Sequence, residues 1–168
     1  MCFAPLRRRG GTLALADAMM AGYLAELPGQ ALQLEAFARR FYGFFNERRF
    51  DKAERMVDLE ALFSFPAAPH HLIGRAGYGE IARRWTEAFP HARLSIRAVH
   101  VSGDAVVTDL RMEGTHRGAL DLPGLEPIPP SGRYAHLQRR ETITVHHGLI
   151  VDVRVEFDPA ALCRILGH

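Results

Sequence analysis

Residues 133–157 read RYAHLQRRETITVHHGLIVDVRVEF, a pattern typical of a β-hairpin. The segment His146-His147-Gly148 supplies a tight turn between two runs that are rich in β-branched residues. In the second run the apolar side chains alternate strictly, at Leu149, Val151, Val153, Val155 and Phe157. Because successive side chains of a strand point to opposite faces, one face of this strand is predicted to be buried.

A second hairpin is predicted upstream, where residues 93–101 and 105–116 flank Ser102-Gly103-Asp104. Residues 117–132 join the hairpins and are rich in proline and glycine. A connection of this length predicts a lid or a disordered segment, with few side chains to anchor it. The chain ends in a predicted short helix, with Asp158 as its cap, Pro159 at its first position and Gly167 beyond its end.

The first half of the chain has a helical period. Residues 33–49 place Leu34, Phe37, Phe41 and Phe44 on one stripe of an amphipathic helix. A second helix is predicted from Phe50, capped by Asp51, with Met56, Leu59 and Phe63 as its apolar face. A third is predicted from Gly77 to Phe89. Helices followed by an antiparallel meander indicate an α+β fold, a curved sheet packed with N-terminal helices around an internal pocket.

Composition indicates a folded globular chain of 168 residues, with 48% hydrophobic and 24% charged residues. Residues 1–29 are expected to form an N-terminal extension, helical or partly disordered, and residues 30–168 a single domain. The net charge of +2 is too small to indicate a nucleic-acid partner. No apolar run is long enough to predict a membrane span. Two cysteines, Cys2 and Cys163, make no disulfide framework, which favours a cytoplasmic location.

The second half of the chain resembles the SnoaL-like polyketide cyclases of the nuclear-transport-factor-2-like superfamily. The resemblance covers about residues 75–167. It rests on the glycine-led helix ending in Phe89-Pro90, the run GTHRG at 114–118, and PPSGR at 129–133. It implies a cone-shaped α+β fold and closure of a ring in an aromatic polyketide by an intramolecular aldol reaction, without metal or cofactor.

The resemblance also implies site residues. The family's acid/base aspartate lies nine residues beyond the glycine of PPSGR, which corresponds to Glu141 here, and its G-T-H histidine corresponds to His116. Two tryptophans common in the family are replaced by Leu110 and Arg154, positions expected to line or border the pocket. Taken with the aromatic residues of the predicted helices, which either line a pocket or belong to the core, the expected substrate-binding residues are Trp85, Tyr42, Leu110, Arg139, Arg154 and Met112.

Glu141 also stands out without the resemblance. It shares the predicted strand face of Ala135, Leu137, Arg139, Ile143 and Val145. A carboxyl group on a mostly apolar face is suited to proton transfer, because desolvation disfavours its charge. The alternative is a structural ion pair with Arg139, which would favour the ionised form.

Histidines offer two further hypotheses. His116 ends a strand beside the long loop, so it either protonates or orients a carbonyl oxygen or is held by backbone groups at a turn. The adjacent pairs His70-His71 and His146-His147 point to opposite faces of an extended chain and chelate poorly, so no metal site is predicted.

The sequence therefore predicts a cofactor-independent cyclase acting on an aromatic polyketide or a related natural-product intermediate. Glu141 would abstract a proton beside a carbonyl, and His116 or the same carboxylic acid would return it. One alternative is different chemistry on the same scaffold: dehydration, epoxide-opening ring closure or cofactor-free hydroxylation. Another is a non-catalytic small-molecule-binding or dimerisation module. The expected partners are the substrate and further copies of the chain, as a homodimer or homotetramer, with no nucleic acid and no membrane.

Overall fold

The computed structural model describes the backbone of residues 12–168 and the side chains of residues 29–168. The predicted extension, residues 1–29, therefore falls almost wholly outside the described side chains. The elements follow in the order α1 (Thr12–Asn46), α2 (Phe50–Glu54), β1 (Val57–Ser64), β2 (Leu72–Ile73), α3 (Gly74–Ala88), β3 (Arg93–Ser102), β4 (Ala105–Thr115), β5 (Tyr134–His146), β6 (Leu149–Glu156) and α4 (Pro159–Leu166). None of the described helices is long and apolar enough to cross a membrane.

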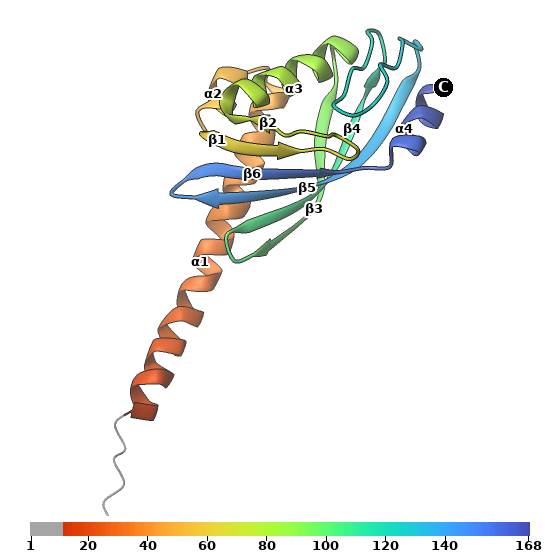
Figure 1. Cartoon of the computed structure of the whole chain (residues 1–168). Coiled ribbons are helices and arrows are strands. Elements are labelled where there is room, and N and C mark those ends of the chain that lie inside the picture. Colours follow the sequence, from red (N-terminus) through yellow and green to blue (C-terminus); the bar gives the residue numbers. More distant parts are fainter. Residues whose placement is uncertain (1–11) are drawn as a thin grey trace, which may run out of the picture.

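One curved sheet contains all six strands, in the order β2-β1-β6-β5-β4-β3. Strands β3 to β6 form an antiparallel meander, and β1 pairs in parallel with β6. Helix α1 packs against β3 and β4, and α3 packs against β1 (Figure 1). The predicted α+β fold, with N-terminal helices packed on a curved sheet, is confirmed.

The core lies between the sheet and these helices. Along β4 the even-numbered side chains from Val106 to Met112 are buried, and along β5 the odd-numbered ones from Ala135 to Val145 face the same side. Their neighbours on the outer face are more polar, as in the ion pair between Arg140 and Asp109. Alternation of this kind is the result of one sheet face being covered by helices and the other being left open. The predicted inner face of β5, which carries Glu141, is confirmed.

The predicted second helix is wrong beyond Glu54. Residues from Val57 to Ser64 form β1, and Asp51 lies in the first turn of α2 rather than capping it. Pairing with β6 and β2 gives the backbone of β1 its hydrogen-bond partners, and Leu59 becomes an exposed residue, 70% accessible. The register of β1 shifts between Val57 and Leu62, which obscures the period of two that is typical of a strand. The apolar residues Met56, Leu59 and Phe63 therefore have a spacing like that of a helix.

Strand β6 also departs from strict alternation. Val153 and Val155 are buried as predicted. Of the residues before them, Ile150 is buried, whereas Leu149 and Val151 are only partly buried. Thr144 pairs with Asp152 and Val145 with Ile150, so Val151 is the extra residue of a β-bulge. The turn before it is confirmed: His147 and Gly148 have φ angles of 50° and 77°, as a two-residue hairpin turn requires.

The loop between β4 and β5 is better anchored than its composition predicts. Leu120, Leu122 and Ile128 are buried, and Leu120 and Ile128 exchange backbone hydrogen bonds of 2.8 and 2.9 Å. The amide of Gly118 donates to the Ala88 carbonyl at the end of α3, and a Cβ at residue 118 would lie 2.3 Å from the carbonyl oxygen of Glu87. The expectation that few side chains anchor this loop is therefore wrong.

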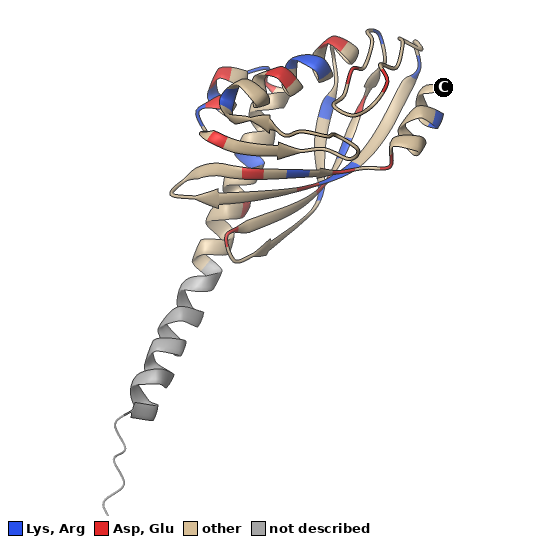
Figure 2. Ribbon diagram, in the orientation of Figure 1, with Lys and Arg blue, Asp and Glu red and all other residues tan. Residues whose placement is uncertain are grey.

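Helices α3 and α4 form where expected. Basic and acidic residues alternate along the outer side of α3 (Figure 2), where Arg83 pairs with Glu87 at 2.7 Å. In α4, the Asp158 side chain accepts a hydrogen bond from the Ala160 amide, and Gly167 ends the helix with a φ of 90°. The predicted capping residues of α4 are confirmed.

Candidate active site

Glu141 lies in the middle of β5 and points from the inner face of the sheet toward the helices. Its register partners are Thr108 on β4 and Val155 on β6. The residue is only 6% exposed and is one of three buried polar or charged residues in the described part of the chain, with Thr108 and His116. A buried carboxylate requires compensating partners, because taking its charge out of water is costly. Two side chains supply this compensation.

The first partner of Glu141 is Arg139, two residues earlier on the same strand face. Its Nε lies 2.7 Å from Glu141 Oε1, an ion pair in which the N–H is not aligned for a hydrogen bond. The guanidinium carbon lies 5.2 Å from the centre of the Trp85 ring, so the cation also stacks on the indole. The ion pair that the sequence left as an alternative is thus present.

The second partner is Tyr42 on α1, whose hydroxyl donates a hydrogen bond of 3.0 Å to Glu141 Oε2. Burial, and then the nearby Glu141 charge, raise the pKa of Tyr42 well above its ordinary value, so the phenol stays protonated. Asn46, one helical turn later, exchanges two hydrogen bonds with the backbone of Leu94 on β3, of 2.7 and 2.8 Å. This side-chain clamp fixes α1 against the sheet and so holds Tyr42 over Glu141.

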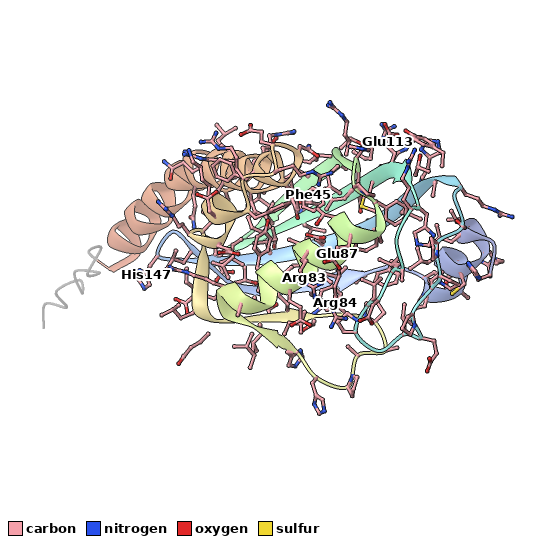
Figure 3. All side chains as sticks on the ribbon, turned by 90° about the horizontal axis from the view of Figure 1, so that it is seen from above. Phe45, Arg83, Arg84, Glu87, Glu113 and His147 are labelled. Carbon is pink, nitrogen blue, oxygen red and sulfur yellow. The ribbon has the colours of Figure 1, made fainter. Side chains whose placement is uncertain are left out.

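A small cavity of about 50 Å³ adjoins Glu141, with room for a few water molecules. Its walls are mostly aromatic and come from α1, α3 and the sheet. In Figure 3, Phe45 lies on the side of α1 that is turned toward α3, whereas Arg83 and Glu87 lie on the outer side of α3. The lining residues are Phe41, Tyr42, Phe45, Phe63, Phe65, Tyr78, Ile81, Ala82, Trp85, Leu94, Arg139, Glu141, Val153 and Val155.

Two further hydroxyls at this site are buried without a hydrogen-bond partner. They are Tyr78 Oη, which lines the cavity, and Thr108 Oγ1, opposite Glu141. Buried polar groups are almost always satisfied, so these two hydroxyls are suited to hold a water molecule or a polar group of a ligand. Neither residue was singled out from the sequence. The alternation of β4 places Thr108 beside Glu141 and could have identified it.

The other predicted substrate-binding residues have different positions. Trp85 and Tyr42 line the cavity, and Leu110 lies on the inner face opposite Arg139. Met112 is also on the inner face, opposite Leu137, but further from Glu141. Arg154 is exposed and lies between the inward-facing Val153 and Val155, so its side chain belongs to the outer face. The expectation that Arg154 borders the pocket is wrong, because the period of two turns it away.

His116 is fully buried, but the structure does not bring it to Glu141. It follows the end of β4, eight residues past Thr108, which is roughly 25 Å along a strand. Its Nδ1 accepts a hydrogen bond of 3.3 Å from the Ser131 amide, and its ring stacks on Phe89 with the centres 5.0 Å apart. Burial lowers the pKa of His116, which favours the neutral ring. His116 therefore fixes the two ends of the loop, as in the alternative prediction of a histidine held by backbone groups at a turn.

Candidate metal ligands do not converge at this site. Within residues 29–168, no three His, Cys, Asp or Glu side chains lie close enough together to hold a metal ion. The cavity beside Glu141 offers a carboxylate, a guanidinium and two phenols.

Comparison with known proteins agrees with the fold. The family model of the SnoaL-like polyketide cyclases matches residues 35–166, so the chain belongs to this family. No curated protein matches the chain by sequence.

Solved structures share the fold at low sequence identity. AclR from Streptomyces galilaeus, a proposed hydroxylase, is 15% identical with a TM-score of 0.67; the match covers 82% of this chain and 97% of AclR. A proposed SnoaL-like polyketide cyclase from Jannaschia sp. CCS1 is 21% identical with a TM-score of 0.66, covering 82% and 94%. IdmH from Streptomyces antibioticus, a proposed polyketide cyclase, is 22% identical with a TM-score of 0.66, covering 81% and 99%.

Proposed function

We propose that the protein is a cyclase that closes a ring in an aromatic polyketide or a related natural-product intermediate by carboxylate acid/base catalysis. The observation that carries the proposal is the buried Glu141, held between Arg139 and Tyr42 at an aromatic cavity. The Arg139 guanidinium, 2.7 Å from Glu141 Oε1, offsets the charge of a carboxylate, the group that would serve as general base. Membership of the SnoaL-like family supports the same chemistry.

In the proposed reaction, a Glu141 oxygen takes a proton from a carbon beside a substrate carbonyl. The resulting enolate attacks a second carbonyl of the same molecule, so a carbon–carbon bond forms and that oxygen becomes an alkoxide. The Glu141 carboxylic acid then returns its proton to the alkoxide. These reaction steps are redox-neutral and require no metal or cofactor. Holding both reacting carbons in one pocket lowers the barrier by several kcal/mol.

The residues around Glu141 each have a role in the proposed reaction. Tyr42 stays protonated and positions Glu141 through its hydrogen bond. Arg139 offsets the carboxylate charge, and Trp85 stacks against a flat substrate. Tyr78 and Thr108 offer their unpaired hydroxyls to a substrate oxygen. His116 has no part in proton transfer, because it holds the loop instead.

Two observations favour alternatives. The fold is also that of AclR, a proposed hydroxylase, so dehydration, epoxide opening or cofactor-free hydroxylation on this scaffold is the second candidate. The cavity of about 50 Å³ is small, which would suit a non-catalytic module. A base that removes a proton beside a carbonyl separates an acid/base enzyme on this scaffold from the non-catalytic module.

Exchange of carbon-bound hydrogen for deuterium tests the proposal directly. The probe is 2-tetralone, a bicyclic ketone with acidic hydrogens beside its carbonyl, followed by proton magnetic resonance in D₂O. We expect the protein to accelerate this exchange above the rate in matched buffer, because Glu141 would form the enolate and return a deuteron. Exchange at the buffer rate would contradict the proposal.

We also propose that the protein works in the cytoplasm as a homodimer or homotetramer. Leu59, Leu62 and Ile73 are exposed together on β1 and β2, and exposed apolar surface of this kind marks association sites. Sedimentation of a clean monomer at micromolar concentration would contradict the oligomer.

A further inference from the structure

A second hollow, of about 320 Å³, lies beneath α4. It exists because β6 ends at Glu156, opposite Arg140, so the first half of β5 pairs with β4 alone. The chain turns at Asp158, and α4 then lies near this open edge of the sheet, where it contacts β5 (Figure 1). A helix covers a strand edge less tightly than another strand would, and the hollow remains between them.

The walls of this hollow are largely apolar. Met112 and Leu137 contribute from the inner face of the sheet, and Phe157, Leu162 and Ile165 from the α4 side. Ile165 is 41% exposed and lies at the rim. Concave, mostly apolar spaces of this size with a few polar groups are typical of small-molecule sites.

The hollow adjoins the Glu141 cavity. Trp85 and Arg139 line both spaces, and their stacked side chains stand at the junction. The Nε–H of Arg139 is not aligned with the Glu141 oxygen, so the guanidinium is held there by charge and stacking and not by a directed hydrogen bond. Movement of the Arg139 side chain would join the two spaces.

The volumes of the two spaces show why a substrate would need both of them. The cavity beside Glu141 holds a few waters and has no room for the whole of a polycyclic molecule, whereas the hollow beneath α4 is several times larger. We infer that the hollow beneath α4 is a second compartment of the binding site, which takes the uncharged, non-reacting aromatic part of an elongated substrate whose reacting end reaches Glu141. This inference rests on the proposed function for the reacting end, but occupancy of the hollow can be measured separately.

Trp85 is the single tryptophan of the chain and stands at the junction, so its fluorescence reports on the hollow. The probe is N-phenyl-1-naphthylamine, an uncharged aromatic molecule that accepts excitation energy from tryptophan. We expect it to quench Trp85 emission saturably, with one probe bound per chain. A probe that leaves Trp85 emission unchanged would overturn the inference.

Two neighbouring alanines of α4 provide a matched pair of variants. Ala161 lines the hollow, whereas Ala160 is exposed and does not line it. Ala161→Phe should weaken probe binding at least tenfold by filling the space, and Ala160→Phe should leave it unchanged, with the melting temperature recorded for both. Ile165→Glu provides a second variant, because a charge at the exposed rim should also weaken binding without disturbing the core. Equal binding by all three variants and the wild type would overturn the inference.

The outcomes separate this inference from the proposed function. If 2-tetralone exchange is absent while Ala161→Phe still weakens probe binding, the hollow is a binding site and the assigned chemistry is wrong. If exchange is present and Ala161→Phe binds the probe as the wild type does, the proposed chemistry is supported and the inference of a second compartment is wrong.

Discussion

Tyr42 and Glu141, 99 residues apart in the chain, are joined by a buried hydrogen bond of 3.0 Å from the phenol to the carboxylate. Helix α1 brings the donor and strand β5 the acceptor, so this contact ties the N-terminal helix to the sheet. Both side chains are almost fully buried. A hydrogen bond to a charged group in such a place contributes to stability and also sets the direction in which the carboxylate oxygens point.

Tyr42→Phe should separate these two contributions. Loss of the hydroxyl removes a hydrogen bond to a buried charge, at a cost of about 1.5 to 3 kcal/mol of unfolding free energy. The exchange rate of 2-tetralone per folded protein should also fall, because Glu141 is then held by Arg139 alone. Chemical denaturation and the exchange assay on the same sample measure both effects. A destabilised variant that keeps the full exchange rate would show that Tyr42 has a structural role only.

Arg139 and Glu141 should show coupled effects on stability. Removing one partner of a buried ion pair leaves an uncompensated charge and costs about 3 to 5 kcal/mol, so Arg139→Met alone is expected to be strongly destabilised. Glu141→Gln alone should cost less, since the arginine keeps its stacking on Trp85. The double variant should be more stable than Arg139→Met, as measured by urea denaturation. Additive losses would contradict the direct pairing.

Thr108→Val tests the unpaired hydroxyl opposite Glu141. The substitution keeps the shape and removes a buried polar atom without a partner, so the stability should be unchanged or higher. The matched control is Val106→Thr, at a fully buried position two residues earlier on the same strand face, which should lose about 1 to 3 kcal/mol. If Thr108→Val is destabilised as much as the control, the Thr108 hydroxyl has a partner in the folded protein.

His116 should make stability depend on pH. Burial lowers its pKa in the folded state below the unfolded value of about 6.5. The unfolded chain therefore binds more protons in mildly acidic solution, and stability is fully present above pH 6.5 and is lost as the pH falls below it. His116→Asn, which keeps an acceptor for the Ser131 amide, should reduce this dependence and preserve 2-tetralone exchange. Loss of exchange in a folded His116→Asn protein would restore His116 as a catalytic candidate.

Local pattern predicted the parts of the site that lie on one strand. The period of two placed Arg139 and Glu141 on the inner face, and the same period placed Arg154 on the opposite face from Val153 and Val155. The resemblance to the family suggested a pocket position for Arg154, and the alternation was the better guide. Alternation is reliable along β5 and the second half of β6, where the pairing register is regular and one face of the sheet is covered by helices.

Contacts between distant segments could not be predicted in the same way. Nothing in the sequence around Tyr42 indicates that its partner is Glu141, since the docking of α1 depends on the Asn46 clamp to Leu94. The helix predicted over β1 is wrong because the register shift of this strand hides its alternation. The loop after His116 was expected to be poorly anchored because three buried apolar side chains are spread among its prolines and glycines.

The measurement that tests the central claim most directly is the exchange rate of 2-tetralone with Glu141→Gln, per folded protein, beside the wild type and Glu141→Asp. The ion pair with Arg139 means that a lower melting temperature alone cannot distinguish a catalytic from a structural Glu141. We predict that Glu141→Gln lowers the rate by a factor on the order of 10² to 10⁴, the usual contribution of a positioned proton-transfer group, and that Glu141→Asp keeps part of it. A folded Glu141→Gln protein that exchanges at the wild-type rate would contradict the account.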